Sequence, residues 1–283
     1  MSENQYLMDF LPPLSSFRNE TSGTITSYRI NQPQIENTER PALVFLHGFN
    51  GSSKSWACQF AHFTSQTVIA IDAPGFGESQ VVDGGMVAIA DEVAAVIASL
   101  VTGKAVIIGH SMGGMLAQVL GATHPDICEA IILSCTHKGR AQPAGSPLGA
   151  AVLERIQQRE VMDDASYGAL RVGKMLLGRI DPQIVAFLAA VAGEIRVEGI
   201  RCGGFAMHYL DTSAFLDKIT APVAIFTGAD DIVVKPDAAA ALKAGLPQAH
   251  HALLAGVGHA PYCEDAASFN AAIEAFLDAV LAG

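Results

Sequence analysis

A serine flanked by glycines stands directly after a short apolar run, and this pairing is typical of a nucleophile held in a sharp turn. The run is residues 105–108, and the segment that follows, Gly109-His110-Ser111-Met112-Gly113, fits the pattern G-x-S-x-G. A strand that ends at such a serine and continues into a helix presents the hydroxyl on a tip. The glycines, with Gly114, let strand and helix approach without Cβ clashes. The sequence therefore predicts that Ser111 is a nucleophile.

A serine nucleophile needs a general base and a carboxylate that orients the base. Two later strand ends supply these residue types. Residues 223–227 lead into Gly228-Ala229-Asp230-Asp231, and residues 250–254 lead into Gly256-Val257-Gly258-His259. The order serine, aspartate, histidine is the one expected for this kind of turn. Spacing alone does not separate Asp230 from Asp231, so both remain candidates for the acid at this point.

Acyl transfer also needs N–H donors for the negative charge of a tetrahedral intermediate, and losing one donor costs roughly 10²–10³ in rate. The N–H of Met112, directly after the serine, is one predicted donor. The loop Leu46-His47-Gly48-Phe49-Asn50-Gly51 follows an earlier strand, and we assign the second donor to Phe49. We interpret His47 as a structural tie within this loop. His110 is expected to pack locally.

The elements that must position these residues alternate along most of the chain. Apolar strands separated by helices are typical of a parallel sheet that is buried on both faces. The predicted strands are residues 24–30, 42–46, 67–71, 105–108, 130–134, 223–227 and 250–254. Helices are predicted at residues 55–63, 86–100 and 112–124, and from residues 236 and 261.

The alternation stops between residues 138 and 216, where only helices are expected, near residues 147–159, 164–177, 182–193 and 198–210. The sequence thus predicts an α/β fold with a mostly parallel, doubly wound sheet. Its core comprises residues 1–137 and 217–283, and a helical lid, residues 138–216, is inserted into it.

Bulk composition narrows the function classes. The chain has 283 residues, half of them hydrophobic, and a formal net charge of −11. An acidic chain without a basic run argues against nucleic acid and anionic membrane partners. No signal peptide or membrane-spanning run is expected. The five cysteines include no C-x-x-C pair, so reduced thiols in a cytoplasmic protein are the simplest interpretation. A small-molecule substrate is expected, with no metal or organic cofactor; a homo-oligomer stays open.

Taken together, the motifs resemble those of the α/β-hydrolase-fold family from about residue 40 to residue 280. The matching segments are His47-Gly48-Phe49, Asp72-Ala73-Pro74-Gly75-Phe76-Gly77-Glu78-Ser79, Gly109-His110-Ser111-Met112-Gly113-Gly114, Gly228-Ala229-Asp230-Asp231 and Gly258-His259. In that family's G-x-x-D loop the fourth residue is the acid, so the resemblance selects Asp231. The helical lid is similar to that of the enol-lactonase and carboxylesterase branches.

Departures from other branches of the family refine this expectation. Ser111 replaces the aspartate nucleophile of haloalkane dehalogenases and epoxide hydrolases. C–C hydrolases usually have a tryptophan after the catalytic histidine and an arginine on a lid helix, whereas Ala260 follows His259 here and residues 182–193 hold no charge. The resemblance therefore implies a serine hydrolase that cleaves a small carboxylic ester, lactone or related acyl compound. The alternatives are a C–C hydrolase, a cofactor-free oxygenase, and a non-catalytic small-molecule receptor.

Charge along the chain points to the substrate. Residues 138–216 hold nine Lys and Arg and eight Asp and Glu, whereas the rest of the chain holds eight and 20. Arg171, Arg196 and Arg201 are candidates to face the pocket and to bind a substrate carboxylate, because guanidinium and carboxylate match geometrically. His208 is a candidate hydrogen-bond donor. The alternative is that these charges form an ordinary solvated helix surface.

Overall fold

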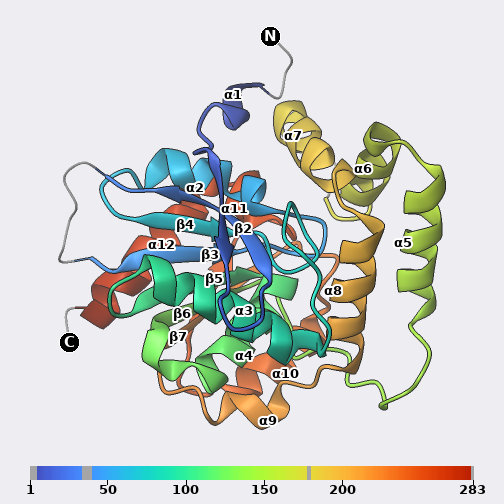
Figure 1. The fold of residues 1–283 in the computed structure, drawn as a ribbon. Coiled ribbons are helices and arrows are strands. Elements are labelled where there is room, and N and C mark those ends of the chain that lie inside the picture. Colours follow the sequence, from blue (N-terminus) through green and yellow to red (C-terminus); the bar gives the residue numbers. More distant parts are fainter. Residues whose placement is uncertain (1–4, 34–39, 177–179, 282–283) are drawn as a thin grey trace.

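One eight-stranded sheet organises the chain, in the order β1-β2-β4-β3-β5-β6-β7-β8. The computed structural model describes residues 5–33, 40–176 and 180–281 (Figure 1). β1 (Leu14–Arg18) and β2 (Ile25–Asn31) lie at one edge, where β1 pairs with β2 and β2 pairs with β4 in antiparallel fashion. All other neighbouring strands pair in parallel. The parallel strands are β3 (Ala42–Leu46), β4 (Val68–Ile71), β5 (Ala105–His110), β6 (Cys128–Ser134), β7 (Val223–Gly228) and β8 (His250–Leu254). The predicted fold class is confirmed.

Helices cover both faces of this sheet, which explains why its central strands are apolar throughout. Successive side chains of a strand point to opposite faces. Ile107 thus packs in the core shared with α3 (Gly85–Leu100), α4 (Met112–Thr123) and α10 (Pro236–Gly245). Its neighbour Ile108 packs in the other core, with α2 (Ala57–His62) and α12 (Ala266–Leu281). The two cores hold the strand ends, and hence the site residues, at fixed positions.

Several local differences separate the structure from the sequence-based expectation. Strand β1 was not predicted, because its residues are partly exposed and polar at the sheet edge. The expected helix at residues 55–63 begins as a 3₁₀ turn, η1 (Ser53–Trp56), which Ser52 caps. The helix expected from residue 261 is two helices, α11 (Pro261–Glu264) and α12, because Asp265 leaves the helical conformation. A short α1 (Gln5–Met8) and the 3₁₀ turn η2 (Pro125–Ile127) were also not predicted.

The regular elements among the described residues between β6 and β7 are all helices, of which α5 to α8 lie on the right of Figure 1 and α9 at its bottom. They are α5 (Ala150–Val161), α6 (Asp164–Gly173), α7 (Pro182–Gly193), α8 (Val197–Tyr209) and α9 (Ser213–Leu216). We call α5–α8 the inserted helices. The end of the helix expected at residues 164–177 reaches residue 177, which lies outside the described residues. The boundaries 138–216 of a separate lid domain stay a prediction.

Helix α8 forms despite its glycines because it lies directly against the sheet domain. A Cβ at Gly199 would stand 2.5 Å from the Gly75 carbonyl oxygen. A Cβ at Gly203 would stand 2.8 Å from the Phe76 ring and 3.0 Å from both Met112 Sδ and the Phe49 ring. The inserted helix thus packs on two residues that are expected to shape the site.

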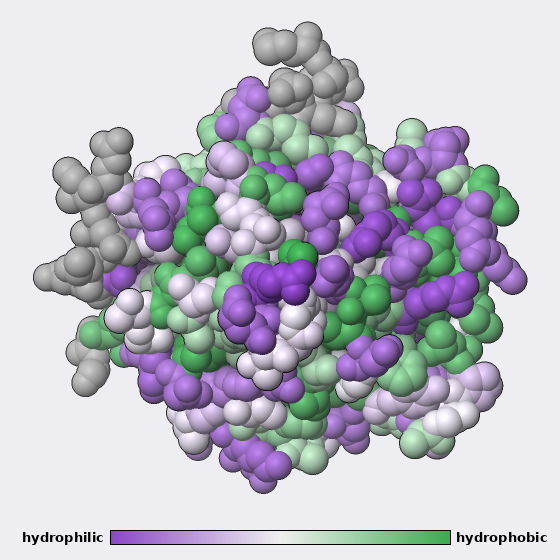
Figure 2. Space-filling model, viewed as in Figure 1, coloured by the Kyte–Doolittle hydropathy of each residue, from purple (hydrophilic) through white to green (hydrophobic). Residues whose placement is uncertain are grey.

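The outer surface is mixed in character. Figure 2 shows hydrophilic side chains spread over one face, with hydrophobic ones scattered among them. Within the described ranges, no helix is both long and apolar enough to cross a membrane.

Candidate active site

Ser111 occupies the strained turn that the sequence predicts between β5 and α4. Its φ is 52° and its ψ is −112°, a conformation that L-residues rarely adopt. A Cβ at Gly109 would lie 2.2 Å from the Gly113 carbonyl oxygen, and a Cβ at Gly113 would lie 2.1 Å from the Leu46 carbonyl oxygen. Only glycine fits these two positions. Thr136 Oγ1, in the segment that follows β6, donates to the Ser111 carbonyl oxygen at 2.6 Å and stabilises the turn.

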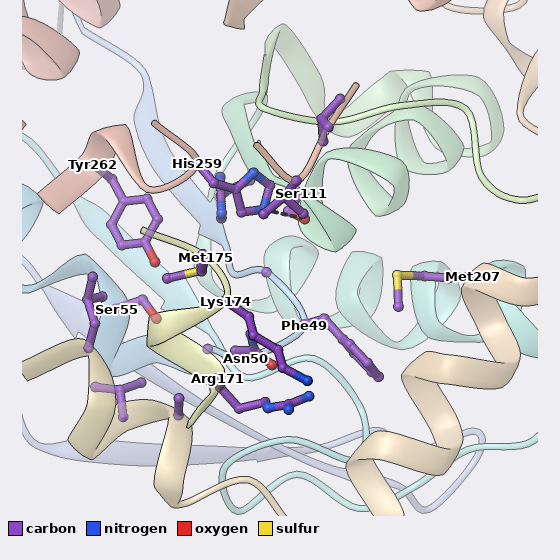
Figure 3. A pocket seen from close by; sticks show the side chains of 18 of the residues that line it. Phe49, Asn50, Ser55, Ser111, Arg171, Lys174, Met175, Met207, His259 and Tyr262 are labelled. Carbon is purple, nitrogen blue, oxygen red and sulfur yellow. Dashed lines mark hydrogen bonds between the residues drawn. The ribbon is translucent and has the colours of Figure 1, made fainter. Parts of the chain in front are cut away.

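The three residues predicted as a triad lie together. His259 Nε2 is 3.2 Å from Ser111 Oγ, the contact marked by the dashed line in Figure 3. His259 Nδ1 is 2.9 Å from Asp231 Oδ2. The histidine and aspartate side chains are 5% and 3% exposed. This geometry allows the imidazole to accept the serine proton while the carboxylate holds its other N–H.

Asp231, rather than Asp230, is the carboxylate that faces His259. Its second oxygen, Oδ1, accepts the N–H groups of Val233 at 2.7 Å and Val234 at 3.0 Å. Burial raises the pKa of Asp231, but the hydrogen bond and charge of His259, with these amides, outweigh it and hold the pKa below its usual value. Asp230 is exposed. The Asp231 carboxylate therefore stays ionised and oriented.

The two predicted oxyanion donors border the same site. Met112 N–H begins α4 directly after Ser111, and Phe49 follows Gly48, whose Cβ would stand 3.3 Å from the Ser111 Cβ. Within the described residues, neither amide donates to a protein acceptor. Two such free N–H groups beside the serine are available to a developing negative charge.

The two other histidines of the motifs have packing roles in the structure. The Ala73 N–H donates to His47 Nε2 at 3.0 Å, so His47 Nδ1–H donates to the Gly48 carbonyl oxygen at 2.8 Å. The His110 ring lies 4.9 Å from both the His259 and Tyr262 rings. Burial, with the neighbouring His259, holds the pKa of His110 well below its usual value. His110 is thus a neutral packing residue.

Glu264 is a site residue that the sequence reading missed. Its Oε2 accepts the Gly258 N–H at 2.8 Å and its Oε1 accepts the Ala260 N–H at 2.6 Å. The carboxylate therefore holds the backbone on both sides of His259. The available signal was an acidic residue in the first helical turn after Pro261, a position that favours carboxylates near free N–H groups.

A cavity of about 180 Å³ opens beside Ser111 and His259 and extends under the inserted helices. Phe49, Met115, Met175, Leu188 and Met207 give it apolar walls. Arg140, Arg155, Arg171 and Lys174 also line it. In Figure 3 the ends of the Arg171 and Lys174 side chains lie on the opposite side of the view from Ser111 and His259.

Of the four predicted substrate-binding residues, only Arg171 lines this cavity. Arg196 instead donates to the Ser79 and Gly75 carbonyl oxygens, at 2.6 and 3.2 Å. Arg201 lies on the surface beside Glu160, and His208 is buried against Ser146. The expectation that these three face the substrate is therefore not met, because helical position alone did not show which side of α8 meets the core.

One group of potential metal ligands lies at the site, within the described residues. Cys135 Sγ, Asp231 and His259 have ligand atoms within 4.8 Å of one another. The aspartate and histidine atoms already hydrogen-bond each other. Burial raises the pKa of the Cys135 thiol far above its usual value, which disfavours the thiolate that a metal needs. The donor set fits a hydrogen-bonded triad better than a metal site.

The family model of the alpha/beta hydrolase fold matches residues 41–266. The chain belongs to this family. Among curated relatives, a pimeloyl-[acyl-carrier protein] methyl ester esterase of Citrobacter koseri is 27% identical over 254 residues, covering 86% of this chain and 96% of the esterase. An AB hydrolase superfamily protein of Bacillus subtilis is 26% identical over 83% of this chain and 90% of its own length.

Solved structures share the fold. The enol-lactonase of Burkholderia xenovorans superposes with a TM-score of 0.79 at 21% identity, covering 94% of this chain and 99% of that one. A thermophilic esterase of Thermogutta terrifontis gives the same TM-score at 23% identity, covering 95% and 99%.

Proposed function

We propose that this protein is a serine hydrolase that cleaves a small carboxylic ester, lactone or related acyl compound through an acyl-enzyme. The observation that carries the proposal is the hydrogen-bonded series Ser111, His259, Asp231, with contacts of 3.2 and 2.9 Å in a buried setting. A curated relative named as a methyl ester esterase supports the same reaction class.

The reaction follows from what each group can donate or accept. Ser111 Oγ attacks the carbonyl carbon as His259 Nε2 takes its proton. The Asp231 carboxylate keeps the proton of His259 on Nδ1 and stabilises the imidazolium. The N–H groups of Met112 and Phe49 receive the negative oxygen of the tetrahedral intermediate. His259 then protonates the leaving group. In the second half of the reaction, water attacks the acyl-enzyme as His259 takes its proton, and His259 returns a proton to Ser111 Oγ as the acid product leaves.

The cavity supports a small substrate with a negative charge. At about 180 Å³, the cavity has room for a small ligand. Arg171, one of the cations that line it, is 3% exposed and forms no ion pair with a described carboxylate. We propose that this guanidinium binds a carboxylate of the substrate.

Turnover of p-nitrophenyl acetate by the purified protein tests the proposal. We expect a burst of p-nitrophenol equal to the enzyme concentration, and its loss in Ser111→Ala. An unchanged steady-state rate in Ser111→Ala would show that the serine is not the nucleophile. Absence of any turnover, across neutral and anionic esters, would favour a binding protein.

A further inference from the structure

The described residues that line the cavity include four cations and no aspartate or glutamate. The cations are Arg140, Arg155, Arg171 and Lys174. A whole chain with a net charge of −11 would repel an anion, so this local excess of positive charge is distinctive. Two of the four, Arg155 and Arg171, carry the inference, because Arg171 is buried and Arg155 is half-buried.

These two guanidiniums hydrogen-bond only neutral oxygens among the described residues. Arg155 Nη1 donates to Asn50 Oδ1 at 2.6 Å, and Arg171 Nη2 donates to Gln158 Oε1 at 2.7 Å. Arg171 Nε is buried and has no protein partner. A guanidinium held away from water without a carboxylate partner is costly, so an anionic ligand that pairs with it is favoured.

The two arginines act on one another as like charges. Burial, followed by the charge of Arg171, lowers the pKa of Arg155 to about 10. Aromatic rings support both groups: the Arg155 guanidinium lies 4.9 Å from the Phe49 ring centre, and that of Arg171 lies 5.3 Å from the Tyr167 ring centre. The nearby acid Glu154 pairs at 3.4 Å with Lys174, and both side chains are more than half exposed. Glu154 attracts both guanidiniums from a distance, but it forms no ion pair with either among the described residues and is itself exposed.

From this charge count we infer that Arg155 and Arg171 bind a dianionic group of the substrate, either a phosphate monoester or two neighbouring carboxylates. A monoanion would leave one positive charge of the pair unmatched, whereas a dianion neutralises both. The planar guanidinium groups offer the paired N–H donors that carboxylate and phosphate oxygens accept. The inference rests on the proposed function, since the dianionic group must share one molecule, and one cavity, with the ester at Ser111.

Arg155 also connects the anion site with the expected oxyanion loop. It reaches from α5 to Asn50 and covers Phe49, whose N–H is a proposed oxyanion donor. A bound dianion would fix the Arg155 side chain and thereby this loop. Removing the Arg155 charge should therefore lower kcat as well as raise KM, whereas removing that of Arg171 should mainly raise KM.

Equilibrium binding to the Ser111→Ala protein tests the site without any turnover. The probes are inorganic phosphate and malonate as dianions, and acetate as a monoanion, measured by calorimetry at pH 7.5. Of the two dianions, we expect the one with the higher affinity to bind at least tenfold more tightly than acetate. Preference for phosphate would assign a phosphate monoester, and preference for malonate would assign a dicarboxylate. Acetate binding within threefold of both dianions would overturn the inference.

Variants on this Ser111→Ala background locate the binding. Arg155→Gln and Arg171→Gln should each weaken dianion binding roughly ten- to a hundredfold, the value of one or two hydrogen bonds to charged groups. Arg201→Gln is the matched control, because this arginine lies on the surface of an inserted helix, and it should bind as the parent does. Dianion affinity unchanged in both cavity variants, with intact melting curves, would also overturn the inference.

A kinetic measurement separates this inference from the proposed function. Wild-type enzyme is offered p-nitrophenyl esters whose acyl group carries no charge, one carboxylate, or two. We expect kcat/KM to rise at each step. Hydrolysis that is equal for all three would leave the serine hydrolase standing and remove the dianion site. If none of the esters is hydrolysed while Ser111→Ala still binds dianions, the dianion site stands and the serine hydrolase proposal falls.

Discussion

Glu264 provides the most specific test of how the site is positioned. Its two carboxylate oxygens accept the N–H groups of Gly258 and Ala260, at 2.8 and 2.6 Å, on either side of His259. Glu264→Gln keeps one acceptor oxygen and turns an NH₂ group toward the other N–H. One partly buried amide is then unsatisfied, which costs about 1–3 kcal/mol of unfolding free energy.

The catalytic effect should exceed the effect on folding. A misplacement of about 1 Å in a reacting group can cost on the order of 10²-fold in rate. We therefore expect kcat for p-nitrophenyl acetate to fall roughly 10- to 100-fold in Glu264→Gln, with KM little changed and the pH profile of kcat shifted. The control is Glu274→Gln on α12, an exposed glutamate that pairs with His62, and it should keep wild-type kinetics. A folded Glu264→Gln protein with unchanged kcat and pH profile would refute the positioning role.

Three further outcomes follow from the site and the packing. Asp231→Asn should lower kcat roughly 10³–10⁴-fold, because the wrong imidazole tautomer is then favoured. Asp230→Asn, at an exposed residue, should change kcat little. The opposite ranking of the two variants in steady-state assays would reassign the acid. Because the folded pKa of Asp231 is depressed, its stabilisation is present above the unfolded pKa of about 3.9 and is lost as pH falls through the folded value. The difference in unfolding free energy between wild type and Asp231→Asn should therefore narrow below about pH 4, and denaturant titrations showing it widen there would contradict this. Gly203→Ala should lower the unfolding free energy by about 1–3 kcal/mol, because its Cβ would meet the Phe76 ring at 2.8 Å, while Gly173→Ala, whose Cβ meets nothing within 4 Å, should melt no earlier than wild type.

Local patterns predicted the fold well where the signal is short-range. The strands Ala42–Leu46 and His250–Leu254 have the same ends in the structure as in the prediction. The elbow at Ser111 was predictable because only glycine tolerates the close contacts around it. β1 was not, since a short, partly exposed edge strand has too few buried residues to leave a periodic pattern.

In the candidate site, too, the features with a short-range sequence signal were predicted and the others were not. The elbow and the loops at strand ends were read from residue types and order. The cation set was not, because which side of a helix meets the cavity depends on packing between distant segments. Arg196 thus contacts carbonyl oxygens of a loop more than a hundred residues away, while Arg155, which no motif marks, reaches Asn50. Glu264 was missed for a different reason: its partners are nearby backbone N–H groups, which no residue type in the sequence marks.

Labelling with a fluorophosphonate probe, read by peptide mass spectrometry, tests the central claim most directly. We expect one adduct per chain, on Ser111, formed quickly by the wild type. Labelling should be absent in Ser111→Ala and strongly slowed in His259→Ala, whose base is missing. An adduct on another residue, or equal labelling of wild type and His259→Ala, would contradict the proposed mechanism.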